Sequence, residues 1–319
     1  MKTITLRPAE PERDFGQIAA LFALEQGEPE SETSLRADYE AQKDRLIHFM
    51  VAEDERGKLL GFDWTARNRN DLENVHFYVI VKPEQRGQGT GRRLYADLEQ
   101  AAQKAHIHRL QISIRDSQPE FRAFAERRGF IERSHSMGLA LDLTAFDDRP
   151  YAEVVARLKG EGFRFTSMEE LGNNEEAQHN LYSLNDTTAM EMPGSDGQHA
   201  WPTFEDFQKS VCQRLWYMPG GQIIAIDKAS GRWAAMSAIT RLEGNDYAYN
   251  LHTGVDKLYR GRQLEQAVLA LALRYARDVL KAASAHTDET PLNLSMLAVY
   301  RELGYKQIEG TFSMVKTLE

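Results

Sequence analysis

Three alternate glycines, Gly87, Gly89 and Gly91, form the stretch of the sequence best suited to bind a phosphate group. Glycine lets a backbone approach a ligand closely, and the first N–H groups of a helix are free to bind an anion at the positive end of the helix dipole. Arg86 and Arg92 add positive charge on either side. The pattern indicates a phosphate or pyrophosphate site.

The residues around the glycines predict a strand, a loop and a helix. His76 to Val81 is apolar, rich in β-branched and aromatic residues, and ends just before Pro83. Beyond the glycines, Leu94, Leu98 and Ala101 recur at helical spacing. The anion is therefore expected at the start of the helix.

The spacing of the glycines differs from two common phosphate motifs. No GxxxxGK[ST] occurs, and the order GxGxG followed by Arg92 does not fit GxGxxG. The spacing does fit Arg-x-x-Gly-x-Gly, carried by Arg86, Gly89 and Gly91. With the strand before it, this loop resembles the acetyl-CoA loop of the GCN5-related N-acetyltransferases, which set the pyrophosphate of their cofactor on the start of this helix.

The resemblance implies how the loop binds acetyl-CoA. Backbone N–H groups in the loop bind the pyrophosphate, and the end of the preceding strand contacts the acyl carbonyl. The residues implied are Ile80, Val81, Arg86, Gly87, Gln88, Gly89, Thr90, Gly91 and Arg92.

The candidates for proton transfer are less well defined. Phe124 to Phe130 resembles the family's YxxxGF segment, but Ala125 stands where the family often has a tyrosine that protonates the departing thiolate. The thiolate is then protonated in another way or leaves unprotonated. Glu73 and His76, near the strand that faces the acceptor, are candidate bases; surface or packing roles are the alternative for both. The arginines of this segment, Arg122, Arg127 and Arg128, are interpreted as a solvated face.

A second copy of these motifs follows in the sequence. Arg260-Gly261 repeats Arg86-Gly87 at an offset of 260 − 86 = 174, and Gly304-Tyr305 repeats Gly129-Phe130 at 304 − 129 = 175. Two motifs at nearly one offset favour a duplication over two unrelated units.

The second copy differs from the first at the chemically important positions. Gln263 and Glu265 replace two loop glycines, so side chains crowd the pyrophosphate site and a carboxylate lies beside an anion. Weak or absent binding of CoA is expected there. Tyr300 matches the family's general acid, and catalysis in the second copy through Tyr300 is an alternative to a packing role.

These patterns predict an α/β fold with two tandem domains, each a mixed central β-sheet flanked by helices. The first domain spans residues 1–146, with the order β-α-α-β-β-β-α-β-α-β. The second spans 147–319, begins with a connecting helix at 151–159, and has a further helix at 203–215. The resemblance covers nearly the whole chain.

Composition limits the class of protein. The chain has 319 residues and a net charge of −9, which argues against a general nucleic-acid binder and is compatible with a cationic acceptor. A single cysteine, Cys212, fits a reducing compartment. The first residues of the sequence contain no apolar core of signal-peptide length, and no apolar stretch is long enough to span a bilayer. We expect a cytoplasmic protein. His106 and His108 have no third ligand at useful spacing, so no metal is expected.

The resulting hypothesis is an N-acetyltransferase that transfers the acetyl group of acetyl-CoA to a primary amine by direct attack in a ternary complex. The acceptor is a small molecule or a peptide amine, contacted by residues 25–39 and 183–202. The alternative from another class is a non-catalytic protein that binds acyl-CoA or a partner. The sequence leaves the oligomeric state open.

Overall fold

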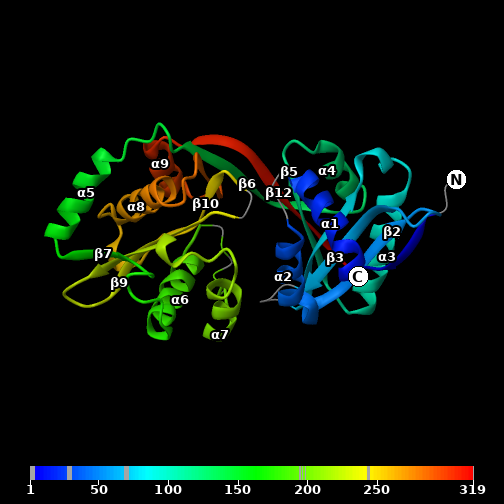
Figure 1. Cartoon of the computed structure of the whole chain (residues 1–319), viewed down its shortest axis with the longest axis horizontal. Coiled ribbons are helices and arrows are strands. Elements are labelled where there is room, and N and C mark those ends of the chain that lie inside the picture. Colours follow the sequence, from blue (N-terminus) through cyan, green and yellow to red (C-terminus); the bar gives the residue numbers. More distant parts are fainter. Residues whose placement is uncertain are drawn as a thin grey trace. The chain divides into compact units, whose positions relative to one another are not determined.

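The computed structural model describes residues 4–26, 31–67, 72–193, 195, 197, 199–242 and 245–318. Parts of both expected acceptor segments lie outside these residues. The chain divides into two compact units, and each is described here by itself. Unit 1 comprises Met1–Ser134 with Phe312–Glu319, and unit 2 comprises His135–Thr311. Figure 1 labels the elements of both.

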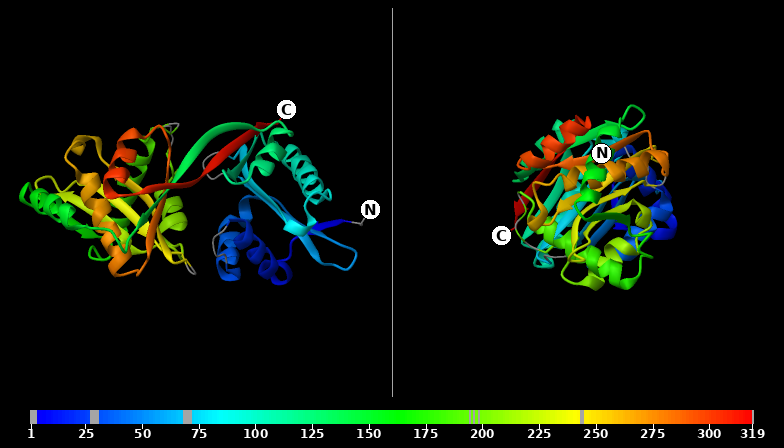
Figure 2. Two further views of the ribbon diagram at one scale, coloured as in Figure 1. Left: turned by 90° about the horizontal axis from the view of Figure 1, so that it is seen from above. Right: turned by 90° about the vertical axis from the view of Figure 1, so that its left-hand side faces the viewer.

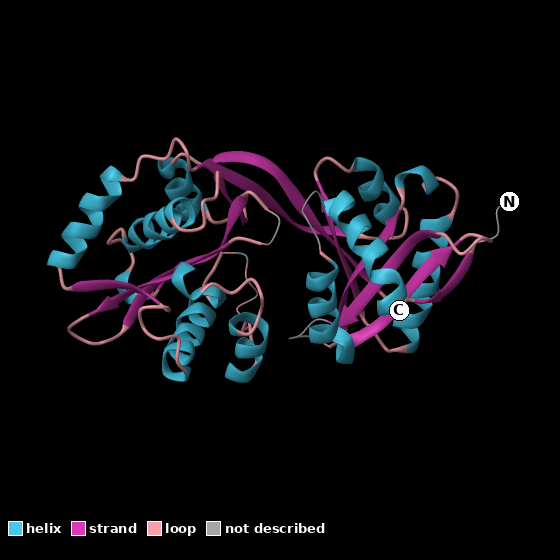
Figure 3. Cartoon of the chain, in the orientation of Figure 1, coloured by secondary structure: helices cyan, strands magenta, loops and turns pink. Residues whose placement is uncertain are grey.

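The order of elements in the first copy is the one that the sequence predicts. The elements are β1 (Thr5–Pro8), α1 (Pro11–Gln26), α2 (Glu32–Gln42), β2 (Leu46–Glu53), β3 (Leu59–Arg67), β4 (Asn74–Val81), α3 (Thr90–Lys104), β5 (Arg109–Arg115), α4 (Pro119–Glu126) and β6 (Ile131–Asp142). A mixed sheet flanked by helices results (Figure 3).

The sheet of unit 1 is covered on both faces, which explains the apolar strand β3. Phe15 and Phe22 of α1 pack with Phe62 of β3 on one face. On the other face, Leu98 of α3 packs with Leu110 of β5. Both faces of the sheet are therefore held by amphipathic helices, and α3 is fixed directly above the strands that surround its N-terminus.

The last strand of the chain completes unit 1. In the strand order, β12 (Lys306–Thr317) lies between β5 and β6, and its last residues belong to unit 1. Met314 is 1% exposed in the core beside α3, and the backbone N–H of Leu318 donates to the carbonyl of His108 at 2.8 Å. In Figure 2 the C-terminus, beyond the red strand, lies within this unit.

Unit 2 repeats the same plan with additional helical turns. It contains α5 (Arg149–Gly160), β7 (Phe163–Ser167), α6 (Glu175–Met190), α7 (Phe204–Phe207), a π-helical turn (Gln208–Cys212), β8 (Gln222–Asp227), β9 (Trp233–Thr240), β10 (Tyr247–Val255), α8 (Leu264–Asp278), β11 (Ser284–Glu289) and α9 (Leu294–Leu303). The helical segment predicted over 203–215 is confirmed over 204–212, where α7 continues directly into the π-helical turn, and is wrong for residues 213–215.

The repeat along the sequence and the units in space divide the chain at different places. The predicted boundary follows the repeat and falls after residue 146. Unit 2 begins earlier, at His135, because β6 pairs with β11 from Met137↔Glu289 to Asp142↔Ser284. Each copy thus gives its last strand to the other copy's unit.

Candidate active site

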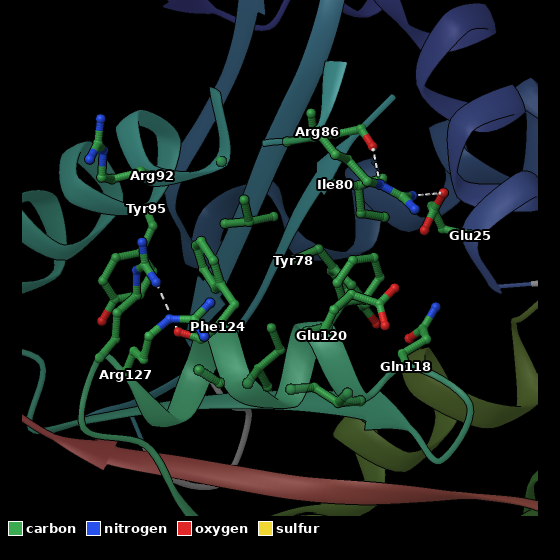
Figure 4. Close-up of a pocket in the computed structure, with 18 of the residues that line it drawn as sticks. Glu25, Tyr78, Ile80, Arg86, Arg92, Tyr95, Gln118, Glu120, Phe124 and Arg127 are labelled. Atoms are coloured by element: carbon green, nitrogen blue, oxygen red, sulfur yellow. Dashed lines mark hydrogen bonds and ion pairs between the residues drawn. The ribbon is translucent and has the colours of Figure 1, made fainter. Parts of the chain in front are cut away.

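The separation of two parallel strands opens the site in unit 1. β4 and β5 pair only from Asn74↔Arg109 to His76↔Gln111, although β4 continues to Val81. Beyond His76 the strands separate. A cavity of about 840 Å³ lies between them and the helices α3 and α4 (Figure 4). This volume falls within the range of small-molecule and cofactor sites.

Eight of the nine residues expected to bind the cofactor line this one cavity. They are Ile80, Val81, Arg86, Gly87, Gln88, Gly89, Gly91 and Arg92. The ninth, Thr90, is the first residue of α3 and is 1% exposed, so its side chain belongs to the interior. The structure therefore brings the predicted residues together as the sequence pattern suggests.

The loop before α3 presents free N–H groups to the cavity. Gly87 and Gly89 have φ angles of 71° and 95°, and Gly89 caps the helix without a side chain. These left-handed angles are adopted readily by glycine alone. Within the described part of the chain, the backbone N–H groups from Gly87 to Arg92 donate to no acceptor. Such a row of donors at a helix N-terminus suits a pyrophosphate.

The glycines also leave the space that such a ligand needs. A Cβ at Gly87 would meet nothing within 4 Å, and one at Gly89 would lie 3.6 Å from an Arg92 nitrogen. A Cβ at Gly91 would lie 3.4 Å from Val81 Cγ2 and 4.0 Å from the Phe124 ring, so larger groups there would enter the cavity. The loop fits the pyrophosphate of CoA.

The side chain of Arg86 is fixed by protein groups. Its Nε donates to the carbonyl of Val81 at 3.1 Å, and its Nη2 pairs with the carboxylate of Glu25. The guanidinium also lies over the ring of Phe121, 4.9 Å from its centroid. Arg86 therefore ties α1 and α4 to the loop and helps to hold the shape of the loop.

Apolar side chains line the part of the cavity that lies between the two strands and α4. Phe77, Val79, Ile112 and Ile114 line it from the two separating strands, and Ala125 lines it from α4. Ala125 is 3% exposed, so a methyl group occupies the position where the family often has a phenol. This part of the cavity suits the long, weakly polar pantetheine arm of CoA.

Polar side chains gather at the end of the cavity away from α3. Figure 4 shows Glu25, Gln118 and Glu120 at this end, with Tyr78 beside them. Ser113 lines the cavity from β5. Of these residues, only Glu25 is expected near the acceptor from the sequence, as the first residue of the segment 25–39. Tyr78 alternates with Ile80 on one face of β4 and could have been found from that period.

The two candidate bases lie outside the cavity lining. Glu73 precedes β4 and is exposed. His76 reaches the cavity through Ser113, whose Oγ lies 3.3 Å from His76 Nε2. Burial lowers the pKa of His76 to about 4, so its imidazole is neutral at pH 7 and is a weak base.

The corresponding strand gap of unit 2 contains a polar cluster. Asn250 Nδ2 donates to Ser237 Oγ at 3.0 Å, and Thr253 Oγ1 donates to Asn250 Oδ1 at 3.2 Å. The hydroxyl of Tyr300 donates to the same oxygen at 3.4 Å, and Tyr300 is 3% exposed. Burial raises the pKa of Tyr300. The phenol thus takes part in a buried network.

Two arginines predicted to be a solvated face belong to the cavity. Arg127 and Arg128 follow α4 and line the cavity, whereas Arg122 pairs with Glu126 and Glu132 on the outside. Arg127 is exposed, in agreement with the prediction, whereas Arg128 is half-buried against the rings of Tyr95 and Phe124, so the prediction is wrong for Arg128. Their position just before the Gly-Phe pair was the signal available in the sequence.

Among the described residues, no group of three or more His, Cys, Asp or Glu side chains is placed to hold a metal ion. None of the helices in the described ranges has both the length and the apolar character needed to cross a membrane.

Comparison with known proteins supports the fold and the chemistry. Residues 15–130 match the family described as "Acetyltransferase (GNAT) family". A mycothiol acetyltransferase from Thermobifida fusca is 25% identical over 312 residues, which cover 95% of this chain and 90% of the relative.

Two solved structures match nearly the whole chain. A GCN5-related N-acetyltransferase from Sphaerobacter thermophilus has a TM-score of 0.71 at 18% identity and covers 98% of this chain and 95% of its own. A tandem GNAT protein from the clavulanic acid biosynthesis pathway has a TM-score of 0.77 at 18% identity, over 99% and 98%. At this level of identity these likenesses show the fold.

Proposed function

Because the chain is a tandem member of the GCN5-related N-acetyltransferase superfamily and an acyltransferase, we propose that unit 1 transfers the acetyl group of acetyl-CoA to a primary amine. The amine belongs to a small molecule or a peptide, and it attacks directly while both substrates are bound. Unit 2 is a degenerate copy that does not bind CoA.

One observation carries this proposal: a single cavity connects three different environments in the order that acetyl-CoA requires. The glycine loop offers N–H groups for the pyrophosphate, and the apolar middle accommodates the pantetheine arm. The end lined by Glu25 and Glu120 is left for the acceptor. Ile80 and Val81 line the cavity between these ends, where their backbone can contact the acyl carbonyl.

The charges at the far end favour a cationic acceptor. Acetyl-CoA supplies an activated thioester, and the acceptor supplies an amine that is protonated at neutral pH. Glu120 in the first turn of α4 attracts this ammonium, and Ser113 and Tyr78 offer hydroxyl groups to orient it. The proton leaves to water or to Glu120, since His76 is too weak a base to hold it.

The departing thiolate needs no acid from α4. Ala125 cannot donate a proton, and a free thiol has a pKa of about 8.5, so its thiolate is a competent leaving group near neutral pH. The same alanine motivates the alternative of a protein that binds acyl-CoA without turnover.

Release of free CoA thiol in the presence of acetyl-CoA and a panel of primary amines tests the proposal. We expect steady turnover with at least one cationic amine and an acetylated product in mass spectra. Glu120→Gln is expected to raise the KM for that amine by roughly five-fold, with a smaller effect on a neutral amine. Tight binding of acetyl-CoA with no turnover across the panel would favour the binding-only alternative.

A further inference from the structure

We propose that Arg92, Arg127 and Arg128 form a subsite for a phosphomonoester, the 3′-phosphate of CoA. The inference rests on the proposed function, because it assumes that the glycine loop holds the pyrophosphate of the same molecule. It concerns a second anion, distinct from the one at the N–H groups of the loop.

The three arginines come together at one end of the cavity. Arg92 lies in the first turn of α3, and Arg127 and Arg128 follow the last turn of α4. All three line the cavity. Figure 4 shows Arg92 and Arg127 beside Tyr95 and Phe124, at the end opposite Glu25 and Glu120. A ligand that extends from the loop away from the acceptor end meets them.

Protein carboxylates do not neutralise this cluster. Over the ranges that the structure describes, none of the three arginines forms an ion pair, although the whole chain carries a net charge of −9. Glu99 acts on Arg128 from a distance, but its carboxylate is bound by Lys316 Nζ at 2.5 Å and by the Tyr95 hydroxyl at 2.7 Å. The positive charge remains available to a ligand.

The structure holds Arg128 in a fixed position. Its Nη1 donates to the carbonyl of Phe124 at 2.8 Å, and its Cζ lies 3.3 Å from the centroid of the Phe124 ring. Burial and the charges of Arg127 and Arg92 lower the pKa of Arg128. Three cations that repel one another across a cavity are stabilised when an anion enters between them.

A phosphomonoester is the anion that fits best. It carries close to two negative charges and several acceptor oxygens at neutral pH, and arginine forks bind such groups through pairs of charge-assisted hydrogen bonds. CoA has one phosphomonoester, on the ribose, in addition to its pyrophosphate. A carboxylate ligand would need fewer cations than the cavity provides here.

The test compares CoA with 3′-dephospho-CoA by titration calorimetry on the full chain. For the wild type we expect dephospho-CoA to bind at least about ten-fold more weakly than CoA. In the double variant Arg92→Gln/Arg127→Gln the ratio should fall to about two-fold or less, because CoA loses more affinity than dephospho-CoA does. Arg128 is kept in this variant because it packs on Phe124.

Arg122→Gln is the matched control, because Arg122 lies on α4 outside the cavity and should leave the ratio unchanged. Equal affinity of the wild type for both ligands, or a ratio that survives in the double variant, would overturn the subsite and leave the proposed function intact. If neither ligand binds to the wild type, both the proposed function and the subsite are wrong.

Discussion

The two glycine loops share one backbone design. Gly89 caps α3 with a φ of 95°, and Gln263 caps α8 in the same left-handed region with a φ of 66°. Arg86 pairs with Glu25 and binds the carbonyl of Val81, while Arg260 makes the same contacts with Glu191 and Val255. A glutamine has therefore kept a conformation that favours glycine.

The side chains around the two loops differ in ways that decide binding. The loop before α8 in unit 2 is occupied by a side chain of the same unit. Arg157 of α5 donates hydrogen bonds to Gln263 Oε1 at 2.9 Å and to the carbonyl of Arg262 at 3.4 Å. Glu265 puts a carboxylate in the first turn of α8, where the dipole otherwise attracts an anionic ligand. The contacts of Arg86 and Arg260 are therefore common to both loops, whereas the glycines at positions 89 and 91 are found in the first loop alone.

The two units also differ in the side chains that lie where their parallel strands separate. The pairs β4–β5 and β10–β11 each stop after the third residue pair. In unit 1 the gap is an apolar cavity that includes Phe77 and Ala125. In unit 2 the side chains of Asn250 on β10 and Tyr300 on α9 hydrogen-bond to each other. The two units therefore share the separation of their parallel strands, but the side chains beside it are apolar in unit 1 and hydrogen-bonded in unit 2.

Transplanting the second loop into the first should have the largest effect. The double variant Gly89→Gln/Gly91→Glu is expected to weaken acetyl-CoA binding at least about a hundred-fold, because a side chain enters the cavity and a carboxylate faces the pyrophosphate. The variant should fold, since Gln263 already tolerates the same geometry. Equilibrium binding and circular dichroism measure the two effects.

Gly162→Gln provides the matched control for backbone strain. Gly162 has a φ of 98° and lies in unit 2, where a Cβ would meet nothing within 4 Å. It should reproduce a modest loss of stability with normal binding of acetyl-CoA. Normal binding by the loop variant as well would mean that the site has been assigned to the wrong loop.

Shortening a buried side chain of β12 should lower the stability of unit 1. Met314 is 1% exposed in the core of unit 1, so Met314→Ala is expected to lower the free energy of unfolding by about 2–4 kcal/mol. Ile308→Ala on the same strand is the control, because Ile308 is 40% exposed and should cost less than about 1 kcal/mol. Urea unfolding followed by fluorescence gives both values. Similar losses would contradict the placement of β12.

One histidine on the central parallel strand of each unit, His76 on β4 and His252 on β10, predicts a dependence of stability on pH. Burial lowers the pKa of His76 and His252 to about 4, whereas an unfolded histidine has a pKa of about 6.5. Between these values the unfolded chain binds more protons, so the free energy of unfolding falls as pH decreases. We expect about 1 kcal/mol per histidine between pH 7 and pH 5, discounted for partial exposure.

Replacement of either histidine by glutamine should reduce the loss of unfolding free energy between pH 7 and pH 5 by the contribution of that histidine, about 1 kcal/mol. Urea unfolding of wild type and variants at pH 7 and pH 5 isolates the effect from that of the carboxylates. If the free energy of unfolding changes with pH equally in wild type and variants, these histidines have ordinary pKa values in the folded protein and the prediction is wrong.

Tyr300→Phe should have the smallest effect. The variant loses the hydrogen bond of the phenol to Asn250, at a cost of about 1 kcal/mol in stability, and its rate of acetyl transfer should equal that of the wild type. Steady-state kinetics provides the check. A clear decrease in kcat would move catalysis to unit 2.

Much of unit 1 follows from local pattern. The glycine spacing predicts the loop, and alternation and helical spacing predict the order of all ten elements of the first copy, as observed. The expected cofactor residues gather at one cavity because they lie on consecutive elements. Local sequence is sufficient where strand, loop and helix follow one another directly.

What escaped prediction depends on contacts between distant parts of the sequence. β11 reads Ser-Ala-His-Thr-Asp-Glu and has little strand character, but it pairs with both β10 and β6. The exchange of β6 and β12 between units cannot be read from either repeat alone. The roles of Arg127 and Arg128 likewise depend on how the turn after α4 faces α3.

The stoichiometry of acetyl-CoA binding tests the central claim most directly. Titration calorimetry of the full chain is expected to give one site per chain in the wild type. The count should stay at one in Gln263→Gly/Glu265→Gly, because Asn250 and Tyr300 still fill the second gap. Two sites per wild-type chain would show that the side chains of the second loop do not block the cofactor, and would contradict the account.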